Sequence, residues 1–403
     1  MQINIKNLTE SKIFLIKYFL LSVISGLDFI MPYTILIFSK YLTPAQVAIV
    51  FVCQTSIKFI LEIPTGALAD RFGRKKTLLL GQASLILSIT LLYFSKDFWI
   101  CCLVMTLWGF CDTMFSGTID SLFYDNMKYH NLHKNYTKYQ IRTGIIFSAV
   151  SSLCFFGAGA IMKYYDNYNI LILLFLVSLI LYFTILASIK DHASKKLSKL
   201  NKDYFKILKQ SLIYTFKHST LLKLTIFSAL FLAMYNFLNT YDGIYLKDIT
   251  NSESMVGILF ATDSIIAFFS AIILEKWINK QNIIGISRNF AIFSIFLVFA
   301  YTLYIFPYSW LLGNIFWMIT IVSTNAFMAK KQEFIPSKLR ATVNSISGMG
   351  FEIVKIGYVL SFGFLSEHIS NKIGFETMGW VTFLICVIFY FVFKMDKHLN
   401  KKR

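Results

Sequence analysis

Residues 62–76 read Glu62-Ile-Pro-Thr-Gly66-Ala-Leu-Ala-Asp70-Arg71-Phe-Gly73-Arg74-Lys-Lys, and they connect two long apolar runs. Gly73 can enter the positive-φ conformations that a tight turn needs. The basic residues around it are typical of a short loop on the cytoplasmic side of a membrane. The stretch therefore predicts a tight, basic connection between two membrane-spanning helices.

The composition of the whole chain agrees with a membrane protein. Of its 403 residues, 56% are hydrophobic and 15% are charged, whereas soluble globular domains carry about 25% charged residues. The formal net charge of +18 alone would suggest nucleic-acid binding. With a mean hydropathy of +0.62, however, a soluble basic domain and intrinsic disorder are both excluded.

Apolar runs long enough to cross a bilayer, which takes about 20 residues, recur along the chain. We expect twelve spanning helices and hence an all-α membrane protein. The runs lie near 13–38, 46–69, 77–95, 98–124, 143–162, 168–189, 221–246, 254–274, 284–306, 309–329, 341–366 and 375–394. One long polar interval predicts an N-terminal six-helix bundle (1–190), a cytoplasmic linker (191–220) and a C-terminal six-helix bundle (221–403).

The basic residues predict the orientation in the membrane. With the N-terminus in the cytoplasm, most of the 39 Lys and Arg fall in cytoplasmic loops, including 71–76, 128–142, the linker and 330–340. This asymmetry favours an even number of spans. We therefore expect a multi-pass protein of the cell membrane with both termini in the cytoplasm.

The string Gly66-x-Leu-Ala-Asp70-Arg71-x-Gly73-Arg74-Lys-Lys resembles the signature loop of the major facilitator superfamily (MFS). The twelve-span pattern with a central basic linker extends this resemblance to the whole chain, which looks like a bacterial efflux-type member. The resemblance implies two six-helix bundles related by pseudo-symmetry. It also implies that this loop is a latch between the bundles, so that Gly66, Asp70, Arg71, Gly73 and Arg74 are gate residues rather than substrate ligands.

Ionisable side chains inside spans cost roughly 2.5–3.5 kcal/mol each on insertion scales and need a reason to be there. Lys58 and Glu62 are four residues apart, and Glu352 and Lys355 are three apart. Side chains at these spacings share one face of a helix. We therefore interpret both as self-neutralising ion pairs with a structural role.

Five acids in the spans have no such neighbour in sequence: Asp28, Asp112, Asp120, Asp242 and Asp263. The MFS resemblance implies that the first, fourth, seventh and tenth spans line a central cavity. All of these acids except Asp263 fall on such spans, and Asp112 lies nearest to mid-membrane. A carboxyl there suits the uptake and release of protons, although a hydrogen-bonded structural acid is the alternative for each. Further candidate cavity residues on these spans are Trp108, Tyr235, Asn236, Tyr241, Trp317 and Asn325.

These features predict a secondary active transporter that moves a small solute by alternating access. Unpaired acids with aromatic neighbours favour an amphipathic or cationic substrate. The lack of a nucleotide-binding P-loop favours proton coupling, and the resemblance to bacterial efflux-type members implies export. An importer of a small metabolite, a lipid flippase and a transporter-like sensor are the alternatives. We expect no enzyme, metal or cofactor, because the sequence lacks HExxH, GxSxG, a P-loop and any Cys/His cluster. The expected partners are the solute, protons and membrane lipids, with no nucleic acid, and the protein is expected to be a monomer.

Overall fold

The computed structural model describes the chain apart from residues 1–4, 192–203, 337–338, 397–398 and 400–403. For residues 5–9, 63–72, 204–209, 271, 275, 340 and 341 it describes the backbone only. All regular secondary structure in the described part is helical. The predicted all-α fold is therefore confirmed.

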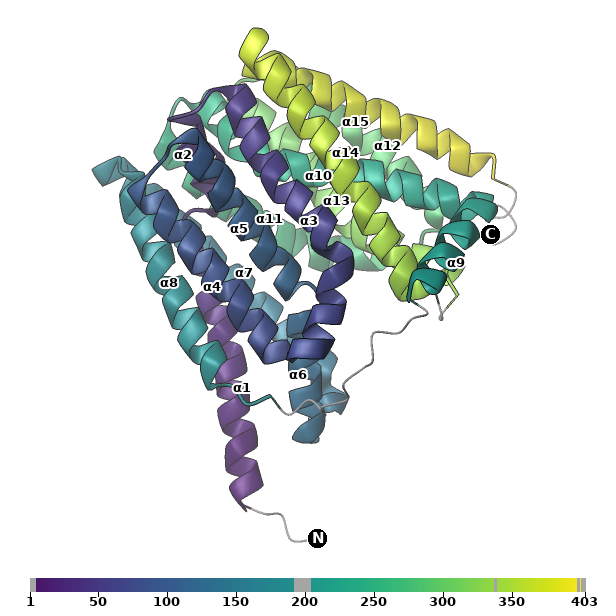
Figure 1. Cartoon of the computed structure of the whole chain (residues 1–403). Helices are drawn as coiled ribbons and strands as arrows, with labels where there is room; N and C mark the ends of the chain where they lie inside the picture. The colour runs from purple at the N-terminus through teal and green to yellow at the C-terminus, as the bar shows by residue number, and fades with distance from the viewer. Residues whose placement is uncertain (1–4, 192–203, 337–338, 397–398, 400–403) are drawn as a thin grey trace.

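Two groups of helices lie side by side (Figure 1). The N-terminal bundle contains α1 (Ile5–Ser25), η1 (Met31–Tyr33), α2 (Thr34–Ser39), α3 (Pro44–Phe72), α4 (Arg74–Phe94), α5 (Phe98–Phe115), α6 (Thr118–Tyr129), η2 (His133–Asn135), α7 (Tyr136–Tyr165) and α8 (Tyr168–Ser188). The predicted linker, 191–220, lies partly outside the described residues, and α9 (Tyr204–Lys217) forms within its second part. The C-terminal bundle contains α10 (Ser219–Thr250), α11 (Glu253–Asn279), α12 (Ile283–Leu303), α13 (Tyr308–Lys331), η3 (Gln332–Phe334), α14 (Arg340–His368) and α15 (Asn371–Lys394).

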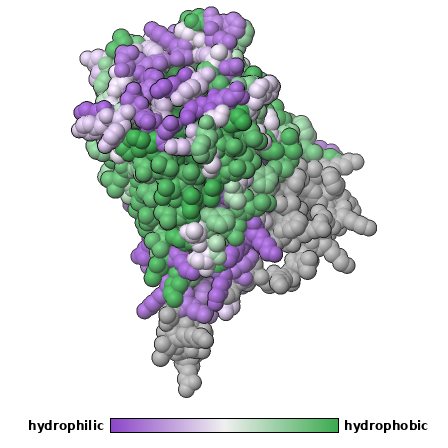
Figure 2. Space-filling model, turned by 60° about the vertical axis from the view of Figure 1, so that its left-hand side comes forward, coloured by the Kyte–Doolittle hydropathy of each residue, from purple (hydrophilic) through white to green (hydrophobic). Residues whose placement is uncertain are grey.

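Among the described residues, 11 helical segments are long and apolar enough to cross a membrane. In this count α5 and α6 form one segment, Phe98–Tyr129. The 21-residue helix α1 lies at the place of the first predicted run. Figure 2 shows a broad apolar belt between two polar ends, as a membrane protein requires.

The first predicted run, 13–38, is not one continuous helix. The chain leaves the helical conformation after α1 and returns to it in η1 and α2. The Asp28 carboxylate accepts hydrogen bonds from the backbone N–H groups of Ile30 (3.2 Å) and Met31 (3.0 Å). Pro32, which follows, has no N–H to donate to a helix. Hydropathy alone does not detect this interruption, because the residues around it remain apolar.

Short polar turns separate the spans and fix where each helix begins. Four helices start at a side chain that accepts a hydrogen bond from a backbone N–H two or three residues later, namely Asp97, Asn167, Asn282 and Ser370. Such caps satisfy N–H groups that the first turn of a helix leaves free. They explain where these four helices begin.

The two bundles meet along two helix pairs, α3 with α14 and α7 with α11. We call the end of the molecule where α8 ends and α9 begins the linker end, and the other end the opposite end. Near the opposite end, glycines bring the paired helices into backbone contact. A Cβ on Gly257 of α11 would lie 2.5 Å from the Phe155 carbonyl and 2.7 Å from the Gly159 nitrogen of α7. Small residues allow such close approach in lipid.

Gly257→Ala is therefore expected to destabilise the protein. The added methyl group has no space between α11 and α7, and overpacking of this kind costs about 1–3 kcal/mol. Gly157→Ala, on the partner helix α7 of the same pair, is the matched control because a Cβ there meets nothing within 4 Å. Thermal unfolding in detergent should show a lower Tm for Gly257→Ala only. Equal Tm values for both variants would contradict this packing.

Candidate functional site

A cluster of charged side chains lies at mid-depth between the two bundles. Lys58 is the middle residue of the 29-residue helix α3. Its Nζ lies 3.4 Å from Asp112 Oδ2 on α5 and 3.9 Å from Glu352 Oε1 on α14. Gln54, one turn earlier on α3, donates from Nε2 to the same Asp112 oxygen at 3.2 Å. Together with Lys355 of α14, these residues form what we call the central cluster.

The C-terminal bundle supplies the most buried members of the central cluster. Glu352 and Lys355 are 7% and 5% exposed. The second carboxylate oxygen of Glu352 is buried without a hydrogen-bond partner among the described residues. Lys355 adds a positive charge that interacts with both Asp112 and Glu352. Two lysines and two acids therefore balance one another where isolated charges would be costly.

The partners differ from those expected from sequence spacing. The ion pairs of Lys58 run to α5 and α14, and among the described residues none within 4.0 Å joins Lys58 to Glu62 or Glu352 to Lys355. Glu62 instead faces α14. A Cβ added to Gly348 of that helix would lie 3.6 Å from Glu62 Oε1. The charges of Lys58 and Glu62, and those of Glu352 and Lys355, still interact at longer range, so a structural role of these pairs stays a prediction.

A glycine brings Asp112 into the central cluster. Gly109 lies one turn before Asp112 on α5, and a Cβ there would lie 2.5 Å from Ile57 Cγ2 and 2.7 Å from the Gln54 carbonyl of α3. This contact holds α5 directly against the part of α3 that carries Lys58. One turn after Asp112, α5 ends and the chain passes through Gly117 at φ +66° into α6.

A second pair of acids lies within the C-terminal bundle. Asp263 Oδ1 of α11 accepts from Trp310 Nε1 (2.9 Å) and Asn314 Nδ2 (3.0 Å) of α13. Asp242 of α10 is close enough to Asp263 for their charges to interact. Within the described residues, no ion pair includes either acid. Unlike the central cluster, this site thus combines two acids without a basic side chain at ion-pair distance in the described part of the chain.

The aromatic candidates lie in different environments. Trp108 stacks on Phe175 of α8 at 6.2 Å between centroids, which is packing within the N-terminal bundle. Trp317 of α13 meets Tyr235 of α10 edge-to-face at 4.8 Å. Tyr241 is buried, and its hydroxyl has no hydrogen-bond partner.

The remaining polar candidates do not join the central cluster. Asn236 is half-buried on α10, and Asn325 is exposed on α13. Asp120, in the first turn of α6, accepts from the Tyr136 hydroxyl at 3.4 Å. Asp28 hydrogen-bonds the turn after α1, as described above.

The signature loop is held against its own bundle at the linker end. Gly73 begins α4 at φ +93°, a conformation that favours glycine. Arg74 forms an ion pair with Asp125 of α6 and donates to the Ser121 carbonyl at 2.8 Å. The side chains of Gly66, Asp70 and Arg71 lie outside the described residues, and only their helical backbone is placed. The described part of the loop thus bonds to α6 and, through Lys75, to the Ala187 carbonyl of α8, both in its own bundle.

Hydrogen bonds join the bundles at the opposite end. Glu367 of α14 accepts from the Ala45 N–H (2.6 Å) and the Thr43 hydroxyl (2.9 Å), so it caps α3 from the other bundle. The Tyr33 hydroxyl donates to the Glu253 carbonyl and accepts from the Gly257 N–H, both at 3.1 Å. The Glu253 side chain also accepts from the Tyr168 hydroxyl of α8 and from Lys247.

Several of these residues were not among the sequence candidates. Gln54, Glu253 and Glu367 carry no local signal, because their partners are distant in sequence. Lys331, predicted in a cytoplasmic loop, is fully buried at the end of α13 and donates to the Ser228 hydroxyl at 2.7 Å. That prediction is wrong because α13 continues to Lys331 and packs against α10 there.

Two bundles of spanning helices that meet around the mid-depth of the membrane are the architecture of many secondary transporters. Residues 18–357 match the sequence model of the Major Facilitator Superfamily. The match covers most of the chain, so the protein belongs to the MFS, a family of multi-pass membrane transporters and not of enzymes.

Comparison with individual proteins agrees. MFS-type transporter YxaM of Bacillus subtilis (strain 168), itself described as uncharacterized, is 25% identical over 234 residues. The alignment covers 56% of each chain, so this chain spans about half the length of that relative. The nucleoside transporter NupG superposes with a TM-score of 0.78 at 12% identity, covering 95% of this chain and 100% of the other. A D-xylose-proton symporter gives 0.70 at 13% identity, covering 93% and 97%. At these identities the likeness to the solved structures concerns the fold alone.

A double-mutant cycle tests the central ion pair. Lys58→Met leaves the Asp112 carboxylate without its ammonium partner and should lower the Tm in detergent. Adding Asp112→Asn should recover part of the loss, with a coupling of about 1 kcal/mol or more, as expected for contacting charges. If the double variant is destabilised by the sum of the two single destabilisations, the pair does not contribute to stability.

Glu367→Ala should weaken the junction at the opposite end, because α3 loses its cap from α14. Spin labels at Tyr41 and Ile369, both exposed beside this junction, would report the separation of the bundles by pulsed electron paramagnetic resonance in a cysteine-free background. The population with the longer distance should increase. Glu376→Ala, at the same end, is the control, since no hydrogen bond or ion pair joins Glu376 to another described residue. An unchanged distance distribution for Glu367→Ala would refute the capping role.

Proposed function

We propose that the protein is a proton-coupled exporter of amphipathic or cationic solutes, with its linker end in the cytoplasm. The observation that carries this proposal is the central cluster, in which Lys58 interacts with Asp112 of one bundle and Glu352 of the other at mid-depth. A carboxylate in this position can hold a proton or a positive charge, but not both at once. Competition between the two is a direct way to couple export of a cation to proton entry.

The proposed cycle uses Lys58 as the group that changes partner. When Asp112 is ionised, it holds Lys58 against α5. A proton on Asp112 removes that attraction and leaves Lys58 with Glu352 of α14. The balance of charge between the bundles then changes, and two packings of the bundles can respond differently. Lys355 keeps Glu352 compensated in both cases.

The proposed solute site extends from the central cluster toward the C-terminal bundle. Asp242 and Asp263 lack a positively charged partner in the described part of the chain, so a cationic solute would offset their charge. The aromatic pair of Tyr235 and Trp317 on α10 and α13 supplies π-faces suited to a cation or a flat apolar group. The site does not include Asp28, Asp120 or Trp108, whose contacts are local.

The signature loop is proposed to act as the gate at the linker end. In the present conformation Arg74 is occupied by Asp125 of its own bundle, while the hydrogen bonds between described residues of the two bundles lie at the opposite end. Gly66, Asp70, Arg71, Gly73 and Arg74 would latch the bundles together when the linker end closes. The abundance of basic residues at the linker end favours a cytoplasmic location of that end and of both termini. The structure would then be closed to the outside.

Ethidium, a flat aromatic cation, is a suitable probe for the proposed export. Cells that express the protein should accumulate less ethidium than cells without it, and a protonophore should abolish the difference. Asp112→Asn should abolish it as well, because the side chain can no longer exchange a proton for a cation. Asp166→Asn is the matched control, since Asp166 is exposed at the end of α7.

The alternatives predict other outcomes of the same comparison. An importer of a small metabolite would raise the cellular content of some solute, which a survey of small molecules in the two cell lines would detect. A flippase would change the sidedness of a labelled lipid. A sensor would change the distribution of neither the small molecules nor the labelled lipid. Ethidium efflux that persists in Asp112→Asn at the level of Asp166→Asn would overturn the proposed role of Asp112.

A further inference from the structure

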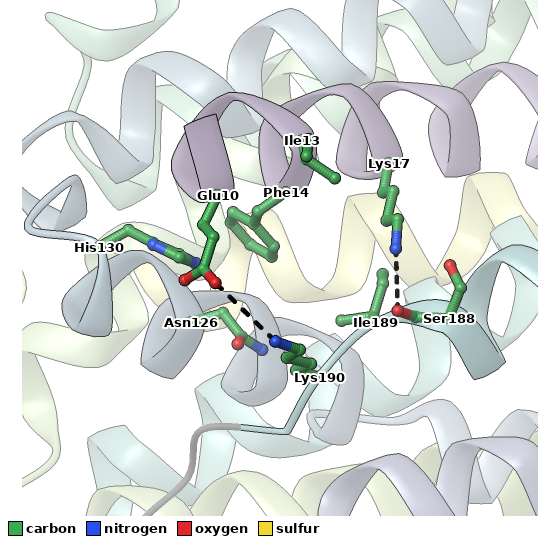
Figure 3. Close-up of a pocket in the computed structure, with 9 residues that line it drawn as sticks. All are labelled: Glu10, Ile13, Phe14, Lys17, Asn126, His130, Ser188, Ile189 and Lys190. Carbon is green, nitrogen blue, oxygen red and sulfur yellow. Dashed lines mark hydrogen bonds and ion pairs between the residues drawn. The ribbon is translucent and has the colours of Figure 1, made fainter. Parts of the chain in front are cut away.

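A pocket of about 260 Å³ lies at the linker end of the N-terminal bundle, apart from the central cluster. Figure 3 shows Glu10, Phe14 and Lys17 pointing from α1 toward α6 and the end of α8. Asn126 of α6 and Lys190, just after α8, contribute to the other side of the pocket. Because α8 ends here, the pocket lies where the apolar belt gives way to the polar end of the molecule.

The pocket contains two lysine ammonium groups that can donate further hydrogen bonds to a ligand. Lys17 Nζ donates to the Ser188 carbonyl at 2.9 Å, which uses one of its three N–H groups. Lys190 lies 4.0 Å from Glu10, and the two side chains are 75% and 40% exposed. A pair so long and so exposed contributes little stability. Both ammonium groups are therefore available to an anionic group in the pocket.

The pocket also presents an acceptor. Glu10 supplies a carboxylate to it, and the Glu10 side chain is 40% exposed. Beside it, Asn126 is only 1% exposed, and its Nδ2 donates to the Leu122 carbonyl at 3.0 Å. The Asn126 Oδ1 is buried without a hydrogen-bond partner among the described residues, so this side of the pocket is polar beneath its surface. The complementary ligand therefore carries both an anion and an N–H donor.

An apolar surface continues from the pocket along α1. Ile13, Ile16 and Leu20 are 47%, 59% and 42% exposed and share one side of the helix. Within the pocket, the Phe14 ring stacks on His130 at 5.4 Å between centroids. A ligand with a zwitterionic head and apolar chains matches this order of polar and apolar surface.

We propose that this pocket binds the head group of a phospholipid that carries a primary amine beside its phosphodiester. Lys17 and Lys190 bind the phosphate, and Glu10 accepts from the ammonium. The acyl chains lie along Ile13, Ile16 and Leu20. A choline head group has no N–H to donate, and a glycerol head group has no positive charge to meet Glu10. The lipid would hold α1 against the end of α8, where the linker begins.

The test is native mass spectrometry of the full-length protein released from nanodiscs. The nanodiscs contain phosphatidylcholine alone, or phosphatidylcholine mixed with phosphatidylethanolamine or with phosphatidylglycerol. Phosphatidylethanolamine should be retained most. Lys17→Gln and Lys190→Gln should each weaken its retention about fivefold, the effect of one basic residue near a lipid head group. Glu10→Gln should reduce the preference over phosphatidylglycerol.

Lys12→Gln is the matched control, because Lys12 is an exposed lysine of the same helix that does not line the pocket. Equal retention of the three lipids, or an equal loss in Lys12→Gln, would overturn the proposal. Competition with soluble glycerophosphoethanolamine shows whether the pocket binds a membrane lipid or a soluble molecule with the same head group. If it displaces the lipid at equal concentration, the pocket serves a soluble phosphodiester rather than the membrane.

Discussion

Placing charge in the middle of a membrane is the constraint on which this structure depends. Lys58, Asp112, Glu352 and Lys355 lie at the depth where an unpaired ion costs most. Their mutual neutralisation requires three helices to meet at that depth, two from one bundle and one from the other. The contact of α3 with α14 is therefore electrostatic at its middle. Removal of one partner leaves another charge uncompensated, so the cluster restricts how far the bundles can separate there.

The contact changes character toward the opposite end. There the helices approach through glycines, and Gly257 lies against the backbone of α7. Polar side chains then cap helices of the other bundle, as Glu367 does at the start of α3. Such contacts depend on close approach and are lost together when the helices separate. A junction of this kind suits a gate that is either closed or open, whereas the central ion pairs reach across longer distances and can change partners.

A structural feature could be predicted from the sequence when the residues that form it lie close together in the sequence. The spans were predictable because bilayer thickness sets the length of an apolar run, and the loop around Gly73 was predictable because its turn is local. The partner of Lys58 was not, since Glu352 is far away in sequence while Glu62 is one turn away. Glu367 gave no signal for the same reason. Its acceptor role exists only after two bundles have packed.

The interruptions of the first and fourth spans show where local signals and function meet. Asp28 lies in the break between α1 and α2, and Asp112 lies one turn before the break at Gly117. Each break frees backbone groups that a continuous helix would satisfy, and this is tolerated at membrane depth only within protein or beside water. At Asp28 the carboxylate itself bonds the freed N–H groups. At Asp112 the carboxylate is instead directed to the side chains of Gln54 and Lys58, so of these two acids it is Asp112 to which we assign the proposed exchange with a proton or a solute.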